Sequence, residues 1–276
     1  MRRRWLSVLP LAAAGGVLGL WAARARQEQA LEPMWRELQA PGADAAFDPA
    51  MADGVPEPAR RYLLHAIAPG TPLARSVRLT MHGTLRLSPG GEALPMRAEQ
   101  VLAPPSGFIW RARVGRGLMR FRGFDRYVHA RGAMRWWLLG LIPIVRADGA
   151  GVTRSAAGRL AGEAVIVPGA LLPRYGAAWE AVDDTTARVR LTVDGEPVTT
   201  TLRIDRQGRL RHASLMRWRE DAGGGAAGYA RFDVELGGER TFGGYTIPAH
   251  LRAGWRLGEP DEFPFFEATL DSAEYR

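Results

Sequence analysis

Apolar and polar residues alternate along much of the chain beyond residue 75. Between Val77 and Leu87 the apolar side chains fall mainly on alternate positions, with residues such as Arg78 and Thr80 between them. Successive side chains of an extended strand point to opposite faces, so a period of two predicts a strand with one buried and one solvated face. The stretch Ser88 to Gly91 then supplies the residues of a turn.

Strand-like stretches of this kind recur to the end of the chain. They cover residues 95–103, 107–114, 118–130, 186–194, 197–205, 209–219, 228–237, 243–256 and 263–275. With the first stretch, about ten strands at regular spacing favour an α+β fold in which β is predominant. We predict a large curved antiparallel sheet, half-barrel-like, that packs on a few helices and follows an N-terminal transmembrane or signal helix.

Three segments carry helix signals, and a fourth is ambiguous. The segment at 58–67, PARRYLLHAI, begins with proline, which suits a first helical turn. Residues 33–39 and 153–164 are the other candidates. The run at 133–145, AMRWWLLGLIPIV, is strongly apolar and contains Pro143. It is predicted to form a buried helix or a loop inserted into a cavity, where it would act as a plug or lid.

The N-terminus looks like a membrane-targeting segment. Arg2 to Arg4 precede 19 uncharged residues, Trp5 to Ala23. At 1.5 Å per residue such a run can cross a hydrocarbon core about 30 Å thick, and the arginines before it predict an N-terminus in the cytoplasm. We predict contact with the cytoplasmic membrane through residues 5–23, in a single pass with the soluble domain outside the cytoplasm. Ala23-Arg24-Ala25 also has the spacing of a signal-peptide cleavage site, so a periplasmic or secreted protein is the alternative.

The chain thus divides into three parts. Residues 1–26 are a signal anchor or signal peptide, and residues 27–57 form a proline-containing tether. Residues 58–276 form a single β-rich soluble domain, since one hydrophobic core can serve a region of that size.

Charge is concentrated in one part of the soluble region. The formal net charge is +8, and all 37 basic residues are arginine. Residues 111–135 hold eight of these arginines and one acid, Asp125. A solvated strand face explains this pattern, and contact with anionic lipid head groups is the functional alternative. Nucleic acid is not expected as a partner, because an exported domain would be separated from the nucleic acid of the cytoplasm.

The residues offer no recognised catalytic or metal motif. Without cysteine there is no disulfide, thiolate metal site or cysteine nucleophile. A G-x-S-x-G elbow and a phosphate-binding P-loop are missing from the sequence, and the five histidines show no metal-ligand spacing. We therefore expect no catalytic residue, metal or cofactor. A carboxylate-dependent hydrolase of the cell envelope remains an alternative, with Glu163 and Glu239 as the acidic pair.

Aromatic residues are spread through the β region. Core packing accounts for such a distribution, but an apolar groove for a hydrophobic or lipid-like ligand would be lined in the same way. The ligand-binding candidates are Trp110, Tyr127, Trp136, Trp179, Trp218, Tyr245 and Trp255, with Arg120 and Arg122 near a head group. The leading hypothesis is a non-enzymatic binding domain. A structural partner of another envelope protein is the third possibility, and an exposed apolar patch without a pocket would favour it.

Several segments between Pro56 and Arg276 carry a resemblance to a known family. They include PEPARRYLLHAI at 56–67, GFIWRA at 107–112 and, most specific, FGGYTIP at 242–248. The chain resembles a bacterial family of membrane-anchored domains of unknown function, so this resemblance implies kinship and no activity. More distantly it is similar to periplasmic lipoprotein carriers with an open half-barrel. That similarity implies a curved antiparallel sheet over helices, with acyl chains held inside.

Overall fold

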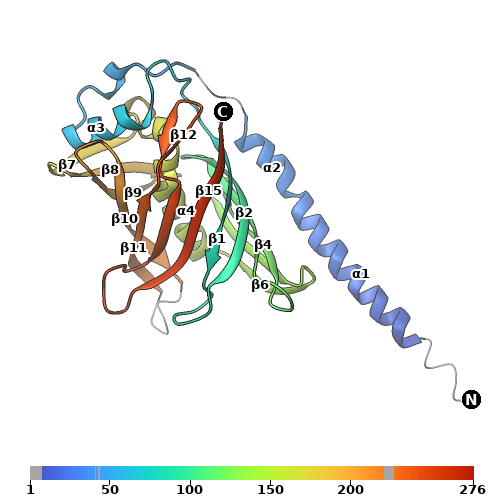
Figure 1. Ribbon diagram of the computed structural model, residues 1–276. Helices are drawn as coiled ribbons and strands as arrows, with labels where there is room; N and C mark the ends of the chain where they lie inside the picture. Colours follow the sequence, from blue (N-terminus) through green and yellow to red (C-terminus); the bar gives the residue numbers. More distant parts are fainter. Residues whose placement is uncertain (1–7, 41, 43, 221–226) are drawn as a thin grey trace, which may run out of the picture.

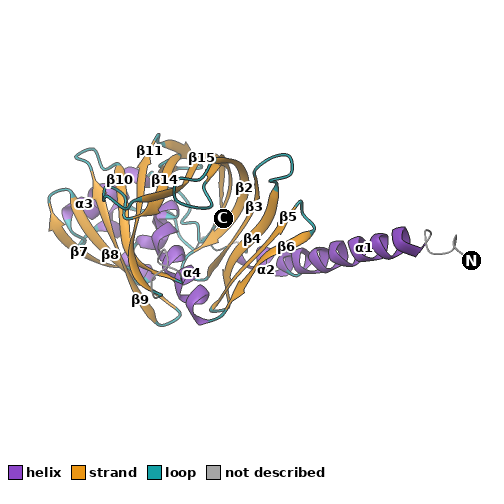
Figure 2. Ribbon diagram, turned by 90° about the horizontal axis from the view of Figure 1, so that it is seen from below, coloured by secondary structure: helices purple, strands orange, loops and turns teal. Residues whose placement is uncertain are grey.

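The computed structural model describes residues 8–40, 42, 44–220 and 227–276, and it has one large curved sheet around an internal helix (Figures 1 and 2). The helices are α1 (Val8–Gln29), α2 (Leu31–Leu38), α3 (Glu57–Ala66) and α4 (Ala150–Glu163), with short 3-10 turns η1 (Pro49–Ala52), η2 (Ala164–Ile166), η3 (Pro168–Leu171) and η4 (Pro173–Tyr175). The strands are β1 (Val77–Leu85), β2 (Leu94–Ala103), β3 (Gly107–Val114), β4 (Phe121–Val128), β5 (Arg131–Leu138), β6 (Ile142–Asp148), β7 (Ala178–Asp183), β8 (Thr186–Val193), β9 (Glu196–Ile204), β10 (Leu210–Arg219), β11 (Gly228–Gly237), β12 (Arg240–Phe242), β13 (Tyr245–Ile247), β14 (His250–Trp255) and β15 (Phe263–Tyr275).

The main sheet has 13 strands in the order β6-β5-β4-β3-β2-β1-β15-β14-β11-β10-β9-β8-β7. Every neighbouring pair is antiparallel, and β12 and β13 form a separate hairpin. Two meanders, β1 to β6 and β7 to β11, are joined through β14 and β15. Because strands twist in one sense, a sheet of this width must curl, and here it curls into an open half-barrel. The predicted fold class, α+β with a large curved antiparallel sheet, is confirmed.

Helix α4 occupies the hollow of the sheet (Figure 2). It follows β6 and, through the 3-10 turns, leads to β7, so it connects the two edge strands of the open side. Its buried side is made of small residues and one leucine, Ala156, Ala157, Gly158, Leu160 and Ala161. Small side chains allow the helix to approach β10 closely: a Cβ built on Gly158 would lie 3.3 Å from Cγ of Arg217.

The prediction for residues 133–145 was wrong. These residues form most of β5, a turn at Leu139 and Gly140, and the first half of β6. In β5 the run lacks alternation because both faces of the sheet are covered there, whereas Ile142 and Ile144 of β6 are exposed apolar residues. Trp136 (8% exposed) belongs to the core inside the half-barrel, whereas its neighbour Trp137 (4%) belongs to a second core on the outer face.

That second core fixes the N-terminal helices to the sheet. Leu31, Trp35 and Leu38 of α2 pack against Val101, Ile109, Phe124, Val128 and Trp137 on the outer face of β2 to β5. The Arg111 guanidinium lies 4.4 Å from the ring centroid of Trp35 and forms an ion pair with Glu32. The segment expected to be a tether, 27–57, therefore includes a helix packed on the domain.

The predicted membrane segment falls partly outside the described residues, which begin at Val8. Within the described part of the chain, no helix has both the length and the hydropathy that a bilayer crossing requires.

Candidate functional site

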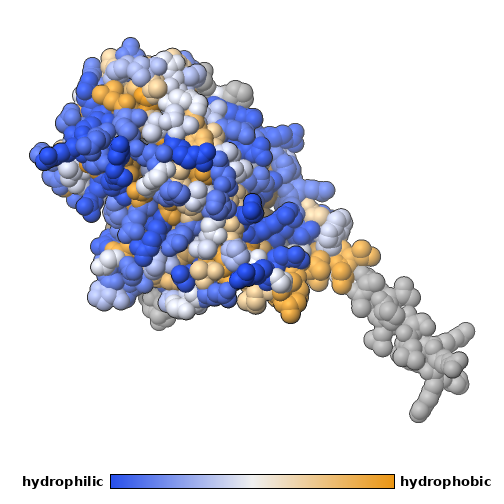
Figure 3. Space-filling model, viewed as in Figure 1, coloured by the Kyte–Doolittle hydropathy of each residue, from blue (hydrophilic) through white to orange (hydrophobic). Residues whose placement is uncertain are grey.

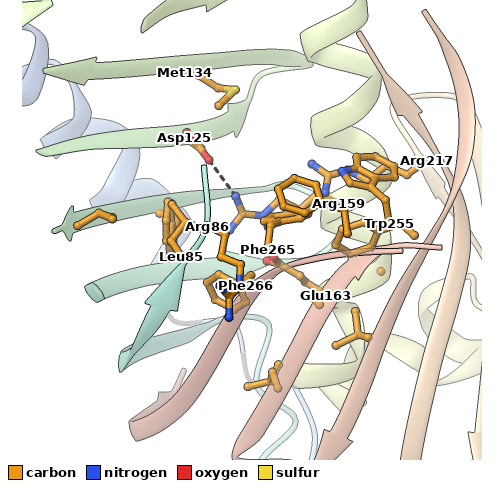
Figure 4. Close-up of a pocket in the computed structure, with 18 of the residues that line it drawn as sticks. Leu85, Arg86, Asp125, Met134, Arg159, Glu163, Arg217, Trp255, Phe265 and Phe266 are labelled. Atoms are coloured by element: carbon orange, nitrogen blue, oxygen red, sulfur yellow. Dashed lines mark hydrogen bonds and ion pairs between the residues drawn. The ribbon is translucent and has the colours of Figure 1, made fainter. Parts of the chain in front are cut away.

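A cavity of about 620 Å³ lies between α4 and the concave face of the sheet (Figure 4). Strands from both meanders contribute to its wall, together with the C-terminal half of α4 and η2. Most of the lining is aliphatic or aromatic: Leu85, Leu87, Trp110, Val114, Phe121, Met134, Trp136, Ile144, Val145, Val165, Ile166, Ala213, Leu215, Phe232, Val234, Leu236, Leu251, Ala253, Trp255, Phe263, Phe265 and Phe266. A volume of this size is typical of small-molecule sites.

The aromatic side chains of the wall form two groups of ring contacts. The ring of Trp110 lies with its centroid 5.7 Å from that of Trp136 and 6.3 Å from that of Phe266. On the other side, Phe232 and Trp255 meet edge to face at 5.2 Å. Alternation on β3, β5, β11, β14 and β15 turns these rings to the concave face, where they form a preorganised apolar surface.

One arginine organises the polar part of the lining. Arg159 on α4 donates from Nε to Glu163 Oε1 (2.7 Å) and from Nη1 to Asp125 Oδ2 (3.2 Å). The remaining carboxylate oxygens accept from Trp136 Nε1 (3.0 Å) and Gln100 Nε2 (2.5 Å). All four oxygens of the two carboxylates therefore have a donor. This arrangement compensates the cost of burying the charges and leaves neither carboxylate free.

Burial and charge shift the pKa values of this group. Burial raises the pKa of Asp125 above its usual range, although Arg159 opposes the effect. Burial alone would lower the pKa of Arg159, but the carboxylates of Glu163 and Asp125 outweigh it, so the pKa is raised. The ion pair at Arg159 is thus maintained by its two partners.

Arg217 on β10 is the second partly buried arginine of the cavity. Its Nε donates to the Ser155 carbonyl (3.0 Å), and its guanidinium lies 4.9 Å from the ring centroid of Phe232 and 5.7 Å from that of Trp255. Among the described residues no carboxylate lies within ion-pair distance of it. Burial, with the positive charge of Arg159, lowers its pKa to about 10, so it stays protonated at neutral pH.

The structure brings together three of the nine predicted ligand-binding residues. Trp110, Trp136 and Trp255 line the cavity. Trp179 donates instead to the Leu171 carbonyl, and Trp218 packs edge to face on Tyr229.

The other four predicted residues lie elsewhere. Tyr127 donates to Asp194, and the Tyr245 hydroxyl bonds to Pro72 and Ala74. Arg122 forms two hydrogen bonds with Glu28 of α1. Arg120 is exposed in the loop before β4.

Of the charged residues of the cavity, sequence reasoning named only Glu163, as half of a hydrolase pair, and missed Arg159, Asp125 and Arg217. Arg159 and Glu163 are four positions apart on α4, within the otherwise small and apolar segment SAAGRLAGEAV. An i, i+4 ion pair inside such a helix is a signal that could have marked a buried charged site. The partner Asp125 and the second arginine, Arg217, are distant in sequence, and no local pattern identifies them.

The carboxylate pair suggested for a hydrolase is not brought together. Glu163 lies in the cavity next to Arg159, whereas Glu239 contacts His65 (3.0 Å) and Arg209 (3.5 Å) near α3. Across the described residues, no group of three His, Asp or Glu side chains has the arrangement of a metal site.

Comparisons with known proteins identify a family for the sequence. The sequence profile of the "Family of unknown function (DUF6544)" matches residues 45–268. This match confirms the resemblance to a family of unknown function. No curated protein matches the chain by sequence.

Three solved structures with some similarity share 8–12% sequence identity with this chain. An outer-membrane lipoprotein-sorting protein domain from Vibrio parahaemolyticus is 8% identical, with 73% of this chain and 85% of that one covered and a TM-score of 0.37. For a LolA superfamily protein from Nitrosomonas europaea the identity is 10%, the coverage 79% and 92%, and the TM-score 0.40. For a DUF1329 family protein from Desulfovibrio piger the corresponding values are 12%, 83% and 94%, and 0.37. Likenesses at this level establish neither a ligand nor an activity.

Proposed function

The chain belongs to DUF6544, a family of unknown function, and we propose that it binds a hydrophobic or lipid-like ligand in the cavity between α4 and the sheet. The observation that carries this proposal is the wall itself: a largely aliphatic and aromatic lining around a space of about 620 Å³. Each methylene group transferred from water to such a surface contributes about 0.8 kcal/mol. For a chain of roughly ten methylenes, the favourable transfer free energy exceeds the lower estimates of the free-energy cost of association, about 4 kcal/mol.

The positive charge of Arg217 favours a ligand with one anionic end. Among the described residues the Arg217 guanidinium has a hydrogen bond only from Nε, so its other N–H groups can donate to a carboxylate or phosphate oxygen without losing an existing partner. The two rings beside it, Phe232 and Trp255, would contact the adjoining part of the ligand. The proposed ligand is therefore an amphiphile whose acidic group lies near Arg217 and whose chain lies along the aromatic wall.

The carboxylates of the cavity favour binding over hydrolysis. Asp125 and Glu163 have all four oxygens engaged by protein donors, so neither is positioned to activate water or protonate a leaving group without breaking the Arg159 network. Their role in this proposal is to hold α4 and the sheet in place.

The associated location is the outer side of the cytoplasmic membrane. We propose that residues 5–23 attach the protein there, and that cleavage after Ala25 would give a periplasmic or secreted form. The mass of the mature protein distinguishes these two outcomes.

Quenching of tryptophan fluorescence by a doxyl-labelled fatty acid tests the ligand proposal. Ala253 lines the cavity, and Ala253→Phe reduces the space available. We expect saturable quenching in the wild type and loss of quenching in A253F. The matched control is Ala181→Phe on the exposed part of β7, which should quench like the wild type. Equal, non-saturable quenching in all three proteins would refute the proposal.

A second titration tests the anionic end. Hydrogen bonds to charged groups contribute about 1.5–3 kcal/mol, so Arg217→Met should weaken fatty-acid binding roughly tenfold to a hundredfold. Binding of the corresponding fatty alcohol should change little. If both ligands lose the same affinity, Arg217 acts only in packing.

A further inference from the structure

Exposed apolar side chains gather at one end of the sheet. Leu118 (81% exposed) and Met119 (54%) are in the loop between β3 and β4, and Ile142 (50%) and Ile144 (47%) begin β6. Figure 3 shows hydrophobic surface at this lower edge, next to the exposed part of α1. We call this surface, Arg116 to Arg120 and Ile142 to Ile144, the rim. Large apolar side chains grouped in this way usually mark an interaction surface.

Helix α1 passes beside the rim and is fixed to the domain there. Arg122 donates to both carboxylate oxygens of Glu28, at 2.8 and 3.2 Å. One turn further along α1, Arg24 lies against the turn between β5 and β6, where a Cβ on Gly140 would be 2.9 Å from its Nη1. Beyond that level α1 exposes Trp21 (53%) and Leu18 (66%). The apolar part of α1 and the rim thus lie at the same end of the molecule (Figure 1).

The rim and its surroundings are positively charged. The exposed arginines here are Arg113, Arg116, Arg120 and Arg146. Within the part of the chain that the structure describes, none of the four forms an ion pair. No acidic residue occurs in 100–124 or in 126–147. The hairpin tips therefore combine large apolar side chains with uncompensated guanidinium groups.

We propose that the rim rests on the surface of a bilayer that contains anionic phospholipids. Leu118, Met119 and Ile142 would enter the interface, and Arg116 and Arg120 would contact the lipid phosphates. Guanidinium groups match phosphate geometry, and amphipathic surfaces of this kind bind membranes by apolar insertion together with charge attraction. Charge complementarity selects this partner over a zwitterionic surface.

The proposal also orients the cavity. Leu87 (57% exposed) and Ile144 (47%) belong to its lining, so its mouth is at the same end of the sheet as the rim. With the rim on the bilayer, the mouth opens close to the acyl chains. Contact of the rim with lipid does not depend on a ligand in the cavity, and the two proposals can fail separately.

The absence of cysteine makes a direct test straightforward, because a single introduced cysteine carries the only label. The full chain with Leu118→Cys, labelled with the fluorophore NBD, is reconstituted into phosphatidylcholine vesicles with or without phosphatidylglycerol and with a spin-labelled lipid as quencher. Val182→Cys is the matched control, since Val182 is also an exposed apolar residue (45%) but lies on β7, which packs near α3. We expect quenching at L118C in the anionic vesicles and none at V182C.

Charge removal then tests the role of the arginines. Each arginine near an anionic surface contributes roughly a fivefold factor, so Arg116→Gln with Arg120→Gln should lower the equilibrium constant for contact by roughly 25-fold. High salt should act in the same direction. The control changes Arg188 and Arg190 on β8 to Gln and should have no effect. Absence of quenching at L118C, or quenching that is equal in pure phosphatidylcholine and insensitive to R116Q/R120Q, would overturn the proposal.

Discussion

Replacement of Arg159 by methionine should be among the most destabilising changes in the cavity. Arg159 is the common partner of Asp125 and Glu163, and the side chains of the three residues are 16%, 17% and 30% exposed. Arg159→Met keeps most of the apolar stem but leaves two largely buried carboxylates without their cation. Breaking a buried pair in this way costs about 3–5 kcal/mol. We expect a loss of free energy of unfolding in this range.

Urea unfolding of the full chain in mild detergent, followed by circular dichroism, measures the loss. For a slope of about 2–3 kcal/mol per molar urea, the midpoint should fall by roughly 1–2 M. The triple variant R159M/D125N/E163Q removes the stranded charges as well and should recover most of the stability. The control is Arg252→Met, whose partners Glu235, Glu262 and Glu267 are 51%, 36% and 59% exposed, and it should cost about 0–1 kcal/mol. A loss below about 1 kcal/mol for R159M, or a triple variant no more stable than the single one, would refute the reasoning.

Three further predictions concern other parts of the molecule. Trp35→Ala removes the centre of the outer core, so it should lower the free energy of unfolding by about 3 kcal/mol and release α2 from the sheet. Amide exchange should become faster in α2 and stay unchanged in the sheet. Gly115 and Gly117 both have positive φ, +81° and +56°, but only at Gly115 would a Cβ clash, 1.9 Å from the Met119 carbonyl oxygen. Gly115→Ala should therefore cost about 1–3 kcal/mol and more than Gly117→Ala, and equal melting temperatures for the two variants would contradict this. Burial lowers the pKa of His212, so below pH 6.5 the unfolded chain takes up a proton more readily than the folded chain, and the free energy of unfolding falls as the pH falls. His212→Gln should reduce this fall between about pH 7 and 5. An unchanged dependence of the free energy of unfolding on pH would contradict the prediction.

The sheet could be predicted from the sequence where only one of its faces is buried. In β1 and β8 apolar and polar residues alternate, and the strand period is visible. In β5 it is not visible, because Trp136 faces the cavity and Trp137 faces the outer core. Helix α2, which covers the outer face of β5, is far away in sequence. The residues of β5 themselves therefore do not indicate that the outer face of this strand is also buried.

The candidate site was predictable mainly in its aromatic part, and of its charged residues only Glu163 was named, for a different role. Trp110, Trp136 and Trp255 lie on strands whose alternation turns them to the concave face. The charged residues depend on tertiary contacts: Asp125 meets Arg159 only because α4 crosses the hollow of the sheet. Sequence pattern fixes the faces of single strands, whereas the pairing of charges follows from how distant elements pack.

The arginine-rich stretch 111–135 illustrates the same limit. From the sequence it is one basic segment, which predicts a solvated face or contact with lipid. In the structure Arg111 and Arg122 hold the N-terminal helices through Glu32 and Glu28, and Arg135 pairs with Asp148. Arg120 stays exposed at the rim. The stretch therefore divides between structural ion pairs and the surface proposed to meet the membrane.

Native mass spectrometry of the full chain, released gently from its own membrane, tests the central proposal most directly. We predict an additional mass that corresponds to one amphiphile, present in the wild type and in A181F and lost in A253F. Of the two substituted alanines, Ala253 lines the cavity and Ala181 does not. A wild-type protein that is consistently bare, or one whose bound mass is unaffected by A253F, would contradict a ligand in this cavity.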